Sequence, residues 1–194
     1  MDINVAPVRV IGIAGSLRTG SHNRRLLEAA RALAPASLHL DIASLDEIPM
    51  YNQDLDVDGQ RPAAVERLKA AVAGADAVLI ATPEYNHSIP GVLQNAIDWL
   101  SRPAMRSPLA GKPVAIVGAS PGVLGAVRAQ QQLKLVLMAT LAQVMPHPGV
   151  AVGQVHEKFD AEGSLVHEPT RKFLTAFLEE LAVWVRRHGV ARAA

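Results

Sequence analysis

Short apolar runs alternate along the chain with longer stretches in which apolar residues recur at helical spacing. The clearest apolar runs cover residues 8–14, 77–81 and 113–118, and weaker ones cover 38–42 and 150–152. Polar residues do not alternate with apolar ones inside the clear runs, so we expect these strands to be buried on both faces. The pattern is typical of a parallel sheet that lies between two layers of helices.

Helical periodicity predicts the elements that connect the strands. We expect helices over residues 23–33, 63–73, 92–100, 127–142 and 169–187, with Pro35, Gly74 and Gly189 as stop signals. The strand-then-helix order predicts one α/β domain over residues 1–194, built on an open sheet of about five strands. In such a sheet, ligands bind beyond the carboxyl ends of the strands, where the strand order reverses.

Composition narrows the possible functions. The 194 residues are 49% hydrophobic and 19% charged, with a formal net charge of +1. The apolar content excludes a disordered chain, and the near-zero charge argues against general binding to nucleic acid or anionic membranes. Cysteine is absent, which excludes disulfides, thiol nucleophiles and metal sites built on cysteine. The sequence shows no secretion signal and no apolar run of membrane-spanning length, so a cytoplasmic location is expected.

The loop after the first strand combines small polar residues with one arginine. Its candidate anion-binding residues are Ser16, Arg18, Ser21 and Asn23. Backbone N–H groups at the start of the next helix attract anions, and the arginine adds a charged donor, so this loop could hold a terminal phosphate. The lysine of a P-loop is missing, because Ser21-His22 stands in its place, and the G-x-G-x-x-G pattern is missing as well. An ordinary strand-to-helix turn with capping residues is the alternative.

The loop after the third strand is stiffened by proline. Pro83, Glu84, Tyr85 and Asn86 place an acid, a ring and an amide at the expected edge of the sheet. A rigid loop with exposed backbone donors and acceptors suits a planar heteroaromatic ring. Together with a phosphate site in the first loop, it indicates a phosphorylated mononucleotide such as a flavin.

The loop after the fourth strand contains Gly118-Ala119-Ser120-Pro121-Gly122, which matches the G-x-S-x-G nucleophile elbow of serine hydrolases. Asp160 and His167 follow it in the hydrolase order. Pro121 argues against a hydrolase, because the residue after the nucleophile supplies an N–H to the oxyanion hole and proline has none. We therefore favour a flexible, glycine-rich loop that faces a ligand, with a plain turn as the alternative.

Three stretches of the sequence, taken together, resemble a known protein family. They are Gly15-Ser16-Leu17-Arg18 with Ser21-His22-Asn23, the block 82–103, and the segment 118–125 with Arg128 and Gln130. They closely resemble the NADPH-dependent FMN reductase family, a flavodoxin-like group that includes bacterial quinone, azo-dye and chromate reductases. The block 82–103 is long and specific, and the resemblance covers nearly the whole chain, weakening after Val150. It implies a three-layer flavodoxin-like fold with strand order 2-1-3-4-5 and one non-covalently bound FMN.

The resemblance also assigns residues by position. It assigns the FMN phosphate to Ser16, Arg18, Ser21 and Asn23. It assigns the isoalloxazine ring to Pro83, Glu84, Tyr85 and Asn86, largely through backbone atoms, and the other side of that ring to Ser120, Gly122 and Gly125. It further implies a homodimer or homotetramer, with the helix 92–100 and Arg128 near subunit contacts.

The function implied by the resemblance is an oxidoreductase that passes hydride from NADPH or NADH through FMN to a small acceptor. A quinone is the first expectation, and an azo compound, chromate or free flavin are others. The cofactor carries this chemistry, so no catalytic side chain is required. A flavodoxin-type electron carrier is the alternative, although such carriers are usually strongly acidic, and a serine hydrolase using Ser120 is a weaker one. The seven histidines lack metal-ligand spacing, so no metal site is expected.

Overall fold

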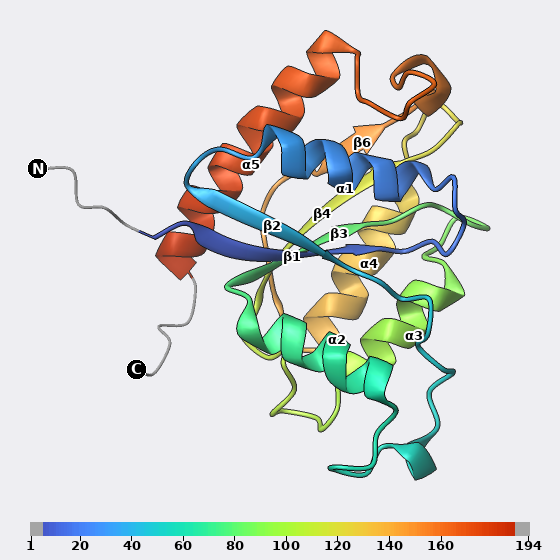
Figure 1. The fold of residues 1–194 in the computed structure, drawn as a ribbon, viewed down its shortest axis with the longest axis vertical. Coiled ribbons are helices and arrows are strands. Elements are labelled where there is room, and N and C mark those ends of the chain that lie inside the picture. The colour runs from blue at the N-terminus through green and yellow to red at the C-terminus, as the bar shows by residue number, and fades with distance from the viewer. Residues whose placement is uncertain (1–5, 189–194) are drawn as a thin grey trace, which may run out of the picture.

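Parallel strands form the centre of the molecule in the computed structural model, which describes residues 6–188 (Figure 1). The strands are β1 (Val8–Ala14), β2 (Leu38–Ala43), β3 (Ala77–Ala81), β4 (Pro113–Ala119), β5 (Gln143–Val144) and β6 (Val150–Val152). Their order is β2-β1-β3-β4-β5, with β6 also paired to β4, and every pairing is parallel. The expected flavodoxin-like order of strands is confirmed.

The position beside β4 is shared by two short strands. β5 pairs with Pro113 and Val114 at the start of β4, and β6 pairs with residues 117–119 at its end. The sequence pattern predicts β6 but gives no sign of β5, which has only two residues, and it extends the preceding helix to residue 142 instead of Ala139. That helix stops earlier since Leu141 has a left-handed backbone (φ 64°) and its carbonyl accepts the Gly111 N–H at 2.9 Å. The chain is thereby turned into the sheet.

The helices are α1 (His22–Leu33), α2 (Ala63–Gly74), α3 (Gly91–Leu100), α4 (Val127–Ala139) and α5 (Glu168–His188), with 3-10 turns η1 (Gln53–Leu55) and η2 (Val155–Glu157). Apart from the end of α4, their bounds agree with the prediction to within one residue. The stop signals Pro35 and Gly74 act where expected, whereas Gly189 lies outside the described residues.

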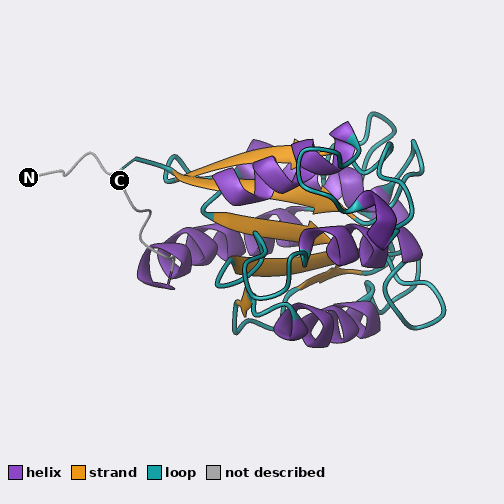
Figure 2. Ribbon diagram, turned by 90° about the horizontal axis from the view of Figure 1, so that it is seen from below, coloured by secondary structure: helices purple, strands orange, loops and turns teal. Residues whose placement is uncertain are grey.

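Helices cover both faces of the sheet (Figure 2). α1 and α5 pack on one face, where Leu26, Leu27 and Leu178 are completely buried. α2, α3 and α4 pack on the other face, around residues such as Leu93 and Leu133. Burial on both sides explains why the strands read as continuous apolar runs. Within residues 6–188, no helix combines the length and apolarity needed to cross a membrane.

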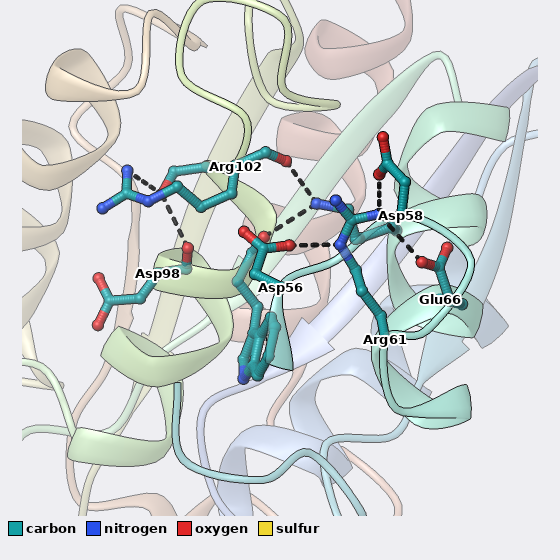
Figure 3. A network of polar contacts seen from close by, with 9 residues as sticks. Asp56, Asp58, Arg61, Glu66, Asp98 and Arg102 are labelled. Atoms are coloured by element: carbon teal, nitrogen blue, oxygen red, sulfur yellow. Dashed lines mark hydrogen bonds and ion pairs between the residues drawn. The ribbon is translucent and has the colours of Figure 1, made fainter. Parts of the chain in front are cut away.

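The connection from β2 to α2 is held by an ion-pair network around one buried arginine (Figure 3). The guanidinium of Arg61 contacts the carboxylates of Asp56, Asp58 and Glu66, and its side chain is only 9% exposed. The hydrogen bond to Asp56 is the largest of several effects that raise the pKa of Arg61 above its ordinary value. The charged guanidinium is therefore a fixed part of this connection.

The same connection is fastened to α3. The Pro49 carbonyl accepts hydrogen bonds from Asn95 Nδ2 at 2.9 Å and from Trp99 Nε1 at 2.8 Å. Lys69 of α2 donates to the carbonyls of Trp99 and Arg102 at the other end of α3. Burial lowers the pKa of Lys69 below its ordinary value. The middle and the C-terminal end of α3 are thus held by this connection and by α2.

Candidate functional site

The three loops singled out in the sequence leave the sheet side by side. β1, β3 and β4 are adjacent, and Ala14 lies beside Ala81 in the register of the sheet. The Gly15 N–H donates to the Ala81 carbonyl at 2.9 Å, and the Thr82 N–H donates to the Val117 carbonyl at 3.0 Å. The structure therefore brings the loops after β1, β3 and β4 together at one edge (Figure 1).

Gly15 allows the first and second of these loops to touch. A Cβ atom at this position would lie 3.1 Å from a methyl carbon of Leu93 and 3.3 Å from Cδ of Pro83. Both distances are shorter than ordinary van der Waals contacts. The glycine thus sets the close approach of the two loops.

Ser21 and Asn23 are buried, and their side chains form hydrogen bonds within the protein. Ser21 Oγ accepts the Arg24 N–H at 3.2 Å and caps α1. Asn23 Oδ1 accepts the Ala119 N–H, and Asn23 Nδ2 donates to the Ala119 carbonyl, each at 2.9 Å. The backbone N–H groups of His22 and Asn23 have no hydrogen-bond partner among residues 6–188. What this turn presents to a ligand is therefore its backbone.

Ser16 and Arg18 lie in the loop that leads to this turn. Ser16 Oγ accepts the Arg18 N–H at 3.4 Å. The Arg18 side chain is exposed and forms no hydrogen bond or ion pair with the described residues. Its guanidinium is available to an anion.

Positive charge gathers around the start of α1, which has no acidic residue in its first turn. Burial lowers the pKa of His22 below its ordinary value, and the charges of Arg18, Arg25 and His156 lower it further. His22 Nδ1 is buried without a hydrogen-bond partner. Neither Arg25 nor His156 lies in a motif of the sequence, and His156 comes from η2, more than a hundred residues away. Only the fold could show that η2 lies near α1.

The loop after β3 is a tight hairpin. The backbone groups of Tyr85 and Ser88 exchange two hydrogen bonds, at 3.1 and 2.9 Å. Asn86 and His87 between them both have positive φ, 51° and 63°, which is the geometry of a type I′ turn. Tyr85 is 55% exposed. The expected rigid loop is present, and it projects a ring into solvent beside the half-buried Pro83.

The side chain of Glu84 caps α4. Its Oε2 accepts the N–H groups of Arg128 at 3.0 Å and Ala129 at 3.2 Å, while Oε1 lies 3.5 Å from the Arg128 guanidinium. α4 has no side-chain cap of its own, because Ala126 occupies that position. Both carboxylate oxygens of Glu84 are thus engaged within the protein, and its role toward a cofactor stays a prediction.

The loop after β4 is held by the segment that follows β6. The Ser120 N–H donates to the Val152 carbonyl at 3.0 Å, and the Gln154 N–H donates to the Gly122 carbonyl at 3.1 Å. Gly125 has φ 57°, and a Cβ there would lie 2.5 Å from the Ala151 carbonyl carbon. Gly122 is exposed, whereas Gly125 is buried against β6. Gly125 is thus required by packing, and its role toward a cofactor stays a prediction.

The side chains of a possible hydrolase triad are engaged elsewhere. Ser120 Oγ donates to the Gly122 carbonyl at 3.2 Å. His167 Nδ1 lies 2.8 Å from Thr170 Oγ1, and Asp160 Oδ1 accepts the Ser164 N–H at 2.7 Å. Neither His167 nor Asp160 is hydrogen-bonded to Ser120. The geometry does not support a serine hydrolase.

Comparison with known proteins agrees with the resemblance. The profile of the family described as NADPH-dependent FMN reductase matches residues 8–157. An NAD(P)H-dependent FMN reductase of Pseudomonas aeruginosa is 43% identical over 93% of this chain and 96% of its own length. A 2-hydroxy-1,4-benzoquinone reductase of a Burkholderia species is 40% identical over 94% of this chain and 99% of its own.

A solved structure is similar over the same range. It is the flavoenzyme NAD(P)H:(acceptor) oxidoreductase FerB of Paracoccus denitrificans, which is 40% identical and superimposes with a TM-score of 0.85. It covers 94% of this chain and 100% of its own. These matches confirm the expected class of enzyme, an FMN-dependent oxidoreductase that uses NAD(P)H. The chain belongs to the NADPH-dependent FMN reductase family.

Proposed function

We propose that this enzyme binds FMN across the three loops at the carboxyl edge and uses a quinone or a similar small molecule as its electron acceptor. The observation that carries the proposal is the convergence of these loops next to the cationic start of α1. The quinone is supported by the Burkholderia relative, whose name is 2-hydroxy-1,4-benzoquinone reductase.

The residues around the start of α1 fit a phosphate group. Two unpartnered backbone N–H groups and an exposed arginine are the groups that a phosphate would satisfy. A charge-assisted hydrogen bond contributes about 1.5–3 kcal/mol. In this proposal Arg18 and Ser16 bind the phosphate directly, and Ser21 and Asn23 act by holding the turn in place.

The other two loops fit the ring. Pro83 and the backbone of residues 84–86 form one wall, and the glycine-rich turn at Ser120 and Gly122 forms the other. The chemistry supplied by FMN when bound is acceptance of hydride from NADPH or NADH and electron transfer to the acceptor. The chain's own residues bind and orient the ring: Glu84 fixes the hairpin to α4, and the hairpin leaves one exposed aromatic side chain, Tyr85, beside the open edge.

We also propose a homodimer, or a homotetramer built from such dimers, that uses the outer face of α3 and α4. Leu135, Met138 and Leu141 are 62%, 64% and 48% exposed, and Met105 nearby is 74% exposed. A groove of about 400 Å³ between α3 and α4 is bordered by Met105 and Leu141. Exposed apolar side chains gathered on one face are typical of a subunit contact. A cytoplasmic location completes the proposal, since the cysteine-free chain needs no oxidising compartment.

The test starts with the cofactor of the purified protein. Flavin released by denaturation is identified, and oxidation of NADPH and NADH is then followed with a panel of quinones, an azo dye, chromate and free flavin. We expect a yellow protein that releases FMN and turns over fastest with a quinone. A colourless protein that cannot be reconstituted with FMN contradicts the proposal. Electron transfer only to a protein partner, with no small acceptor reduced, favours the electron carrier.

A further inference from the structure

The first turn of α4 holds two of the three loops at the carboxyl edge. Glu84 ties the hairpin after β3 to this turn through the N–H groups of Arg128 and Ala129. Gln130 comes next in the same turn, and it is only 1% exposed. The contacts of Gln130 lead to the loop after β4 and to β6.

The side-chain nitrogen of Gln130 donates to two carbonyls. Nε2 lies 3.2 Å from the Val150 carbonyl oxygen and, in a weaker contact, 3.4 Å from the Gly125 carbonyl oxygen. Gly125 belongs to the loop after β4, and Val150 is the first residue of β6. Because both neighbours are acceptors, only the nitrogen of the amide fits on this side, and the orientation of the side chain is fixed. One buried group thus joins the loop after β4 to the strand beside it.

Glycines make room for this amide on two sides. A Cβ atom at Gly118 would lie 2.9 Å from Gln130 Nε2, and one at Gly149 would lie 2.3 Å from Gln130 Oε1. Oε1 is buried and has no hydrogen-bond partner within residues 6–188. An apolar side chain of similar shape would avoid the cost of burying this oxygen. Stability alone therefore does not explain an amide at this position.

The loop that Gln130 holds has a packed base and an exposed tip. A Cβ atom at Gly153 would lie 2.2 Å from the Val123 carbonyl oxygen, so the segment after β6 packs closely against the loop. At the tip, Val123 and Leu124 are 76% and 46% exposed. The position of the tip is thus determined by the contacts at the base, and the hydrogen bond from Gln130 to Gly125 is one of them.

We propose that Gln130 is a positioning residue for the flavin ring: its amide holds the loop after β4 so that Ser120 and Gly122 form their wall of the ring site. This inference rests on the proposed binding of FMN across the three loops. Gln130 is buried and acts through the loop. Loss of its amide weakens the contacts with the ring and leaves the phosphate contacts of Arg18 unchanged.

FMN and riboflavin distinguish these two parts of the site. Both flavins carry the ring, and only FMN carries the phosphate. A change at the wall of the ring site alters the affinity for both flavins by the same factor, whereas a change at the phosphate site alters the affinity for FMN alone. The stability of the fold affects neither affinity as long as the variant is folded.

The experiment uses the full chain freed of flavin, titrated with FMN and with riboflavin. Quenching of flavin fluorescence gives each Kd, visible absorption reports the surroundings of the bound ring, and circular dichroism verifies folding. Gln130→Met keeps the length of the side chain and removes the donor. Gln132→Met is the matched control, because Gln132 lies in the same helix and is exposed. Gln130→Glu is the second variant if the first does not fold, since it keeps the shape and replaces the amide nitrogen with an oxygen.

We expect Gln130→Met to raise the Kd values of FMN and riboflavin by the same factor, about 3- to 10-fold, the size expected for the loss of one neutral hydrogen bond. The visible spectrum of the bound flavin should shift as well. Gln130→Glu should change both Kd values in the same direction, and Gln132→Met should change neither.

Three results overturn the inference. They are an effect on FMN alone, a less stable Gln130→Met protein whose two Kd values and spectrum are unchanged, and failure of both Gln130 variants to fold, which assigns the amide a purely structural role. In each of these cases the wild type still binds FMN. Failure of the wild type to bind FMN overturns the proposed function, and the inference with it.

Discussion

The side-chain amide of Asn23 binds both backbone polar groups of Ala119, 96 residues further along the chain. Asn23 lies in the first turn of α1, and Ala119 is the last residue of β4. Both hydrogen bonds are 2.9 Å long and buried. One side chain thus sets the position of the α1 start relative to the loop after β4, which are the two sides of the candidate cofactor site.

Replacement of Asn23 by alanine should therefore destabilise the whole fold. The change leaves a buried N–H and a buried C=O of Ala119 without partners, at a cost of about 2–4 kcal/mol in the free energy of unfolding. Urea unfolding followed by circular dichroism measures it. Asn52→Ala is the control, since Asn52 is exposed and caps only η1, and its cost should stay below about 1 kcal/mol. Similar losses in the two variants would contradict this role of Asn23.

Arg18→Ala should weaken FMN binding without destabilising the protein. The exposed guanidinium has no partner within the described residues, so its removal breaks no contact of the folded chain. Loss of a charged hydrogen bond of about 1.5–3 kcal/mol predicts a Kd for FMN raised about 10- to 100-fold. Flavin fluorescence titration measures the change, with Arg31→Ala at the far end of α1 as control. An unchanged Kd would show that Arg18 does not bind the phosphate.

Glu84→Gln tests the cap that joins the hairpin to α4. The amide retains one acceptor atom but loses the negative charge that the N–H groups of Arg128 and Ala129 and the helix dipole favour. We expect a loss of about 1 kcal/mol in the free energy of unfolding, together with a change in the visible absorption of bound FMN as the hairpin loosens. Glu47→Gln, which alters an exposed ion pair with Arg67, is the control and should change neither. A normal absorption spectrum in Glu84→Gln would mean that the hairpin is held by other contacts.

Much of this architecture was accessible from the sequence because buried parallel strands and their helices leave a strong hydrophobic pattern. The three loops at the carboxyl edge were predicted from this pattern, and the strand order implied by the family resemblance was also correct. β5 was not predicted, since a two-residue strand has no periodicity and Leu141 carries no sequence signal for a left-handed backbone. The direction in which the Glu84 side chain points could not be predicted from the sequence either. Nothing local to Glu84 shows that it caps a helix that begins 43 residues later, at Val127.

The environment of His22 predicts how the flavin-free protein responds to acid. Burial and nearby cations lower the pKa of His22 in the folded state relative to the ordinary value of 6.5. The unfolded chain therefore binds a proton more readily than the folded one, and stability falls as the pH drops below about 6.5. Urea unfolding at about pH 7.5 and about pH 5.5 should show a smaller loss for His22→Gln than for wild type. An identical loss in both proteins would show that other groups control the acid response.

Leu135→Lys tests the subunit contact proposed for the outer face of α3 and α4. Leu135 is 62% exposed, so a lysine there is well solvated in the isolated subunit and should leave its free energy of unfolding nearly unchanged. In a dimer the same lysine would be buried against apolar side chains, which is costly for a charge. Light scattering after size-exclusion chromatography should therefore show a dimer or tetramer for wild type and a smaller species for Leu135→Lys. Phe173→Lys is the matched control, because Phe173 is 50% exposed on α5, which covers the opposite face of the sheet. Dissociation by Phe173→Lys but not by Leu135→Lys would move the contact to α5, and a monomeric wild type would remove it altogether.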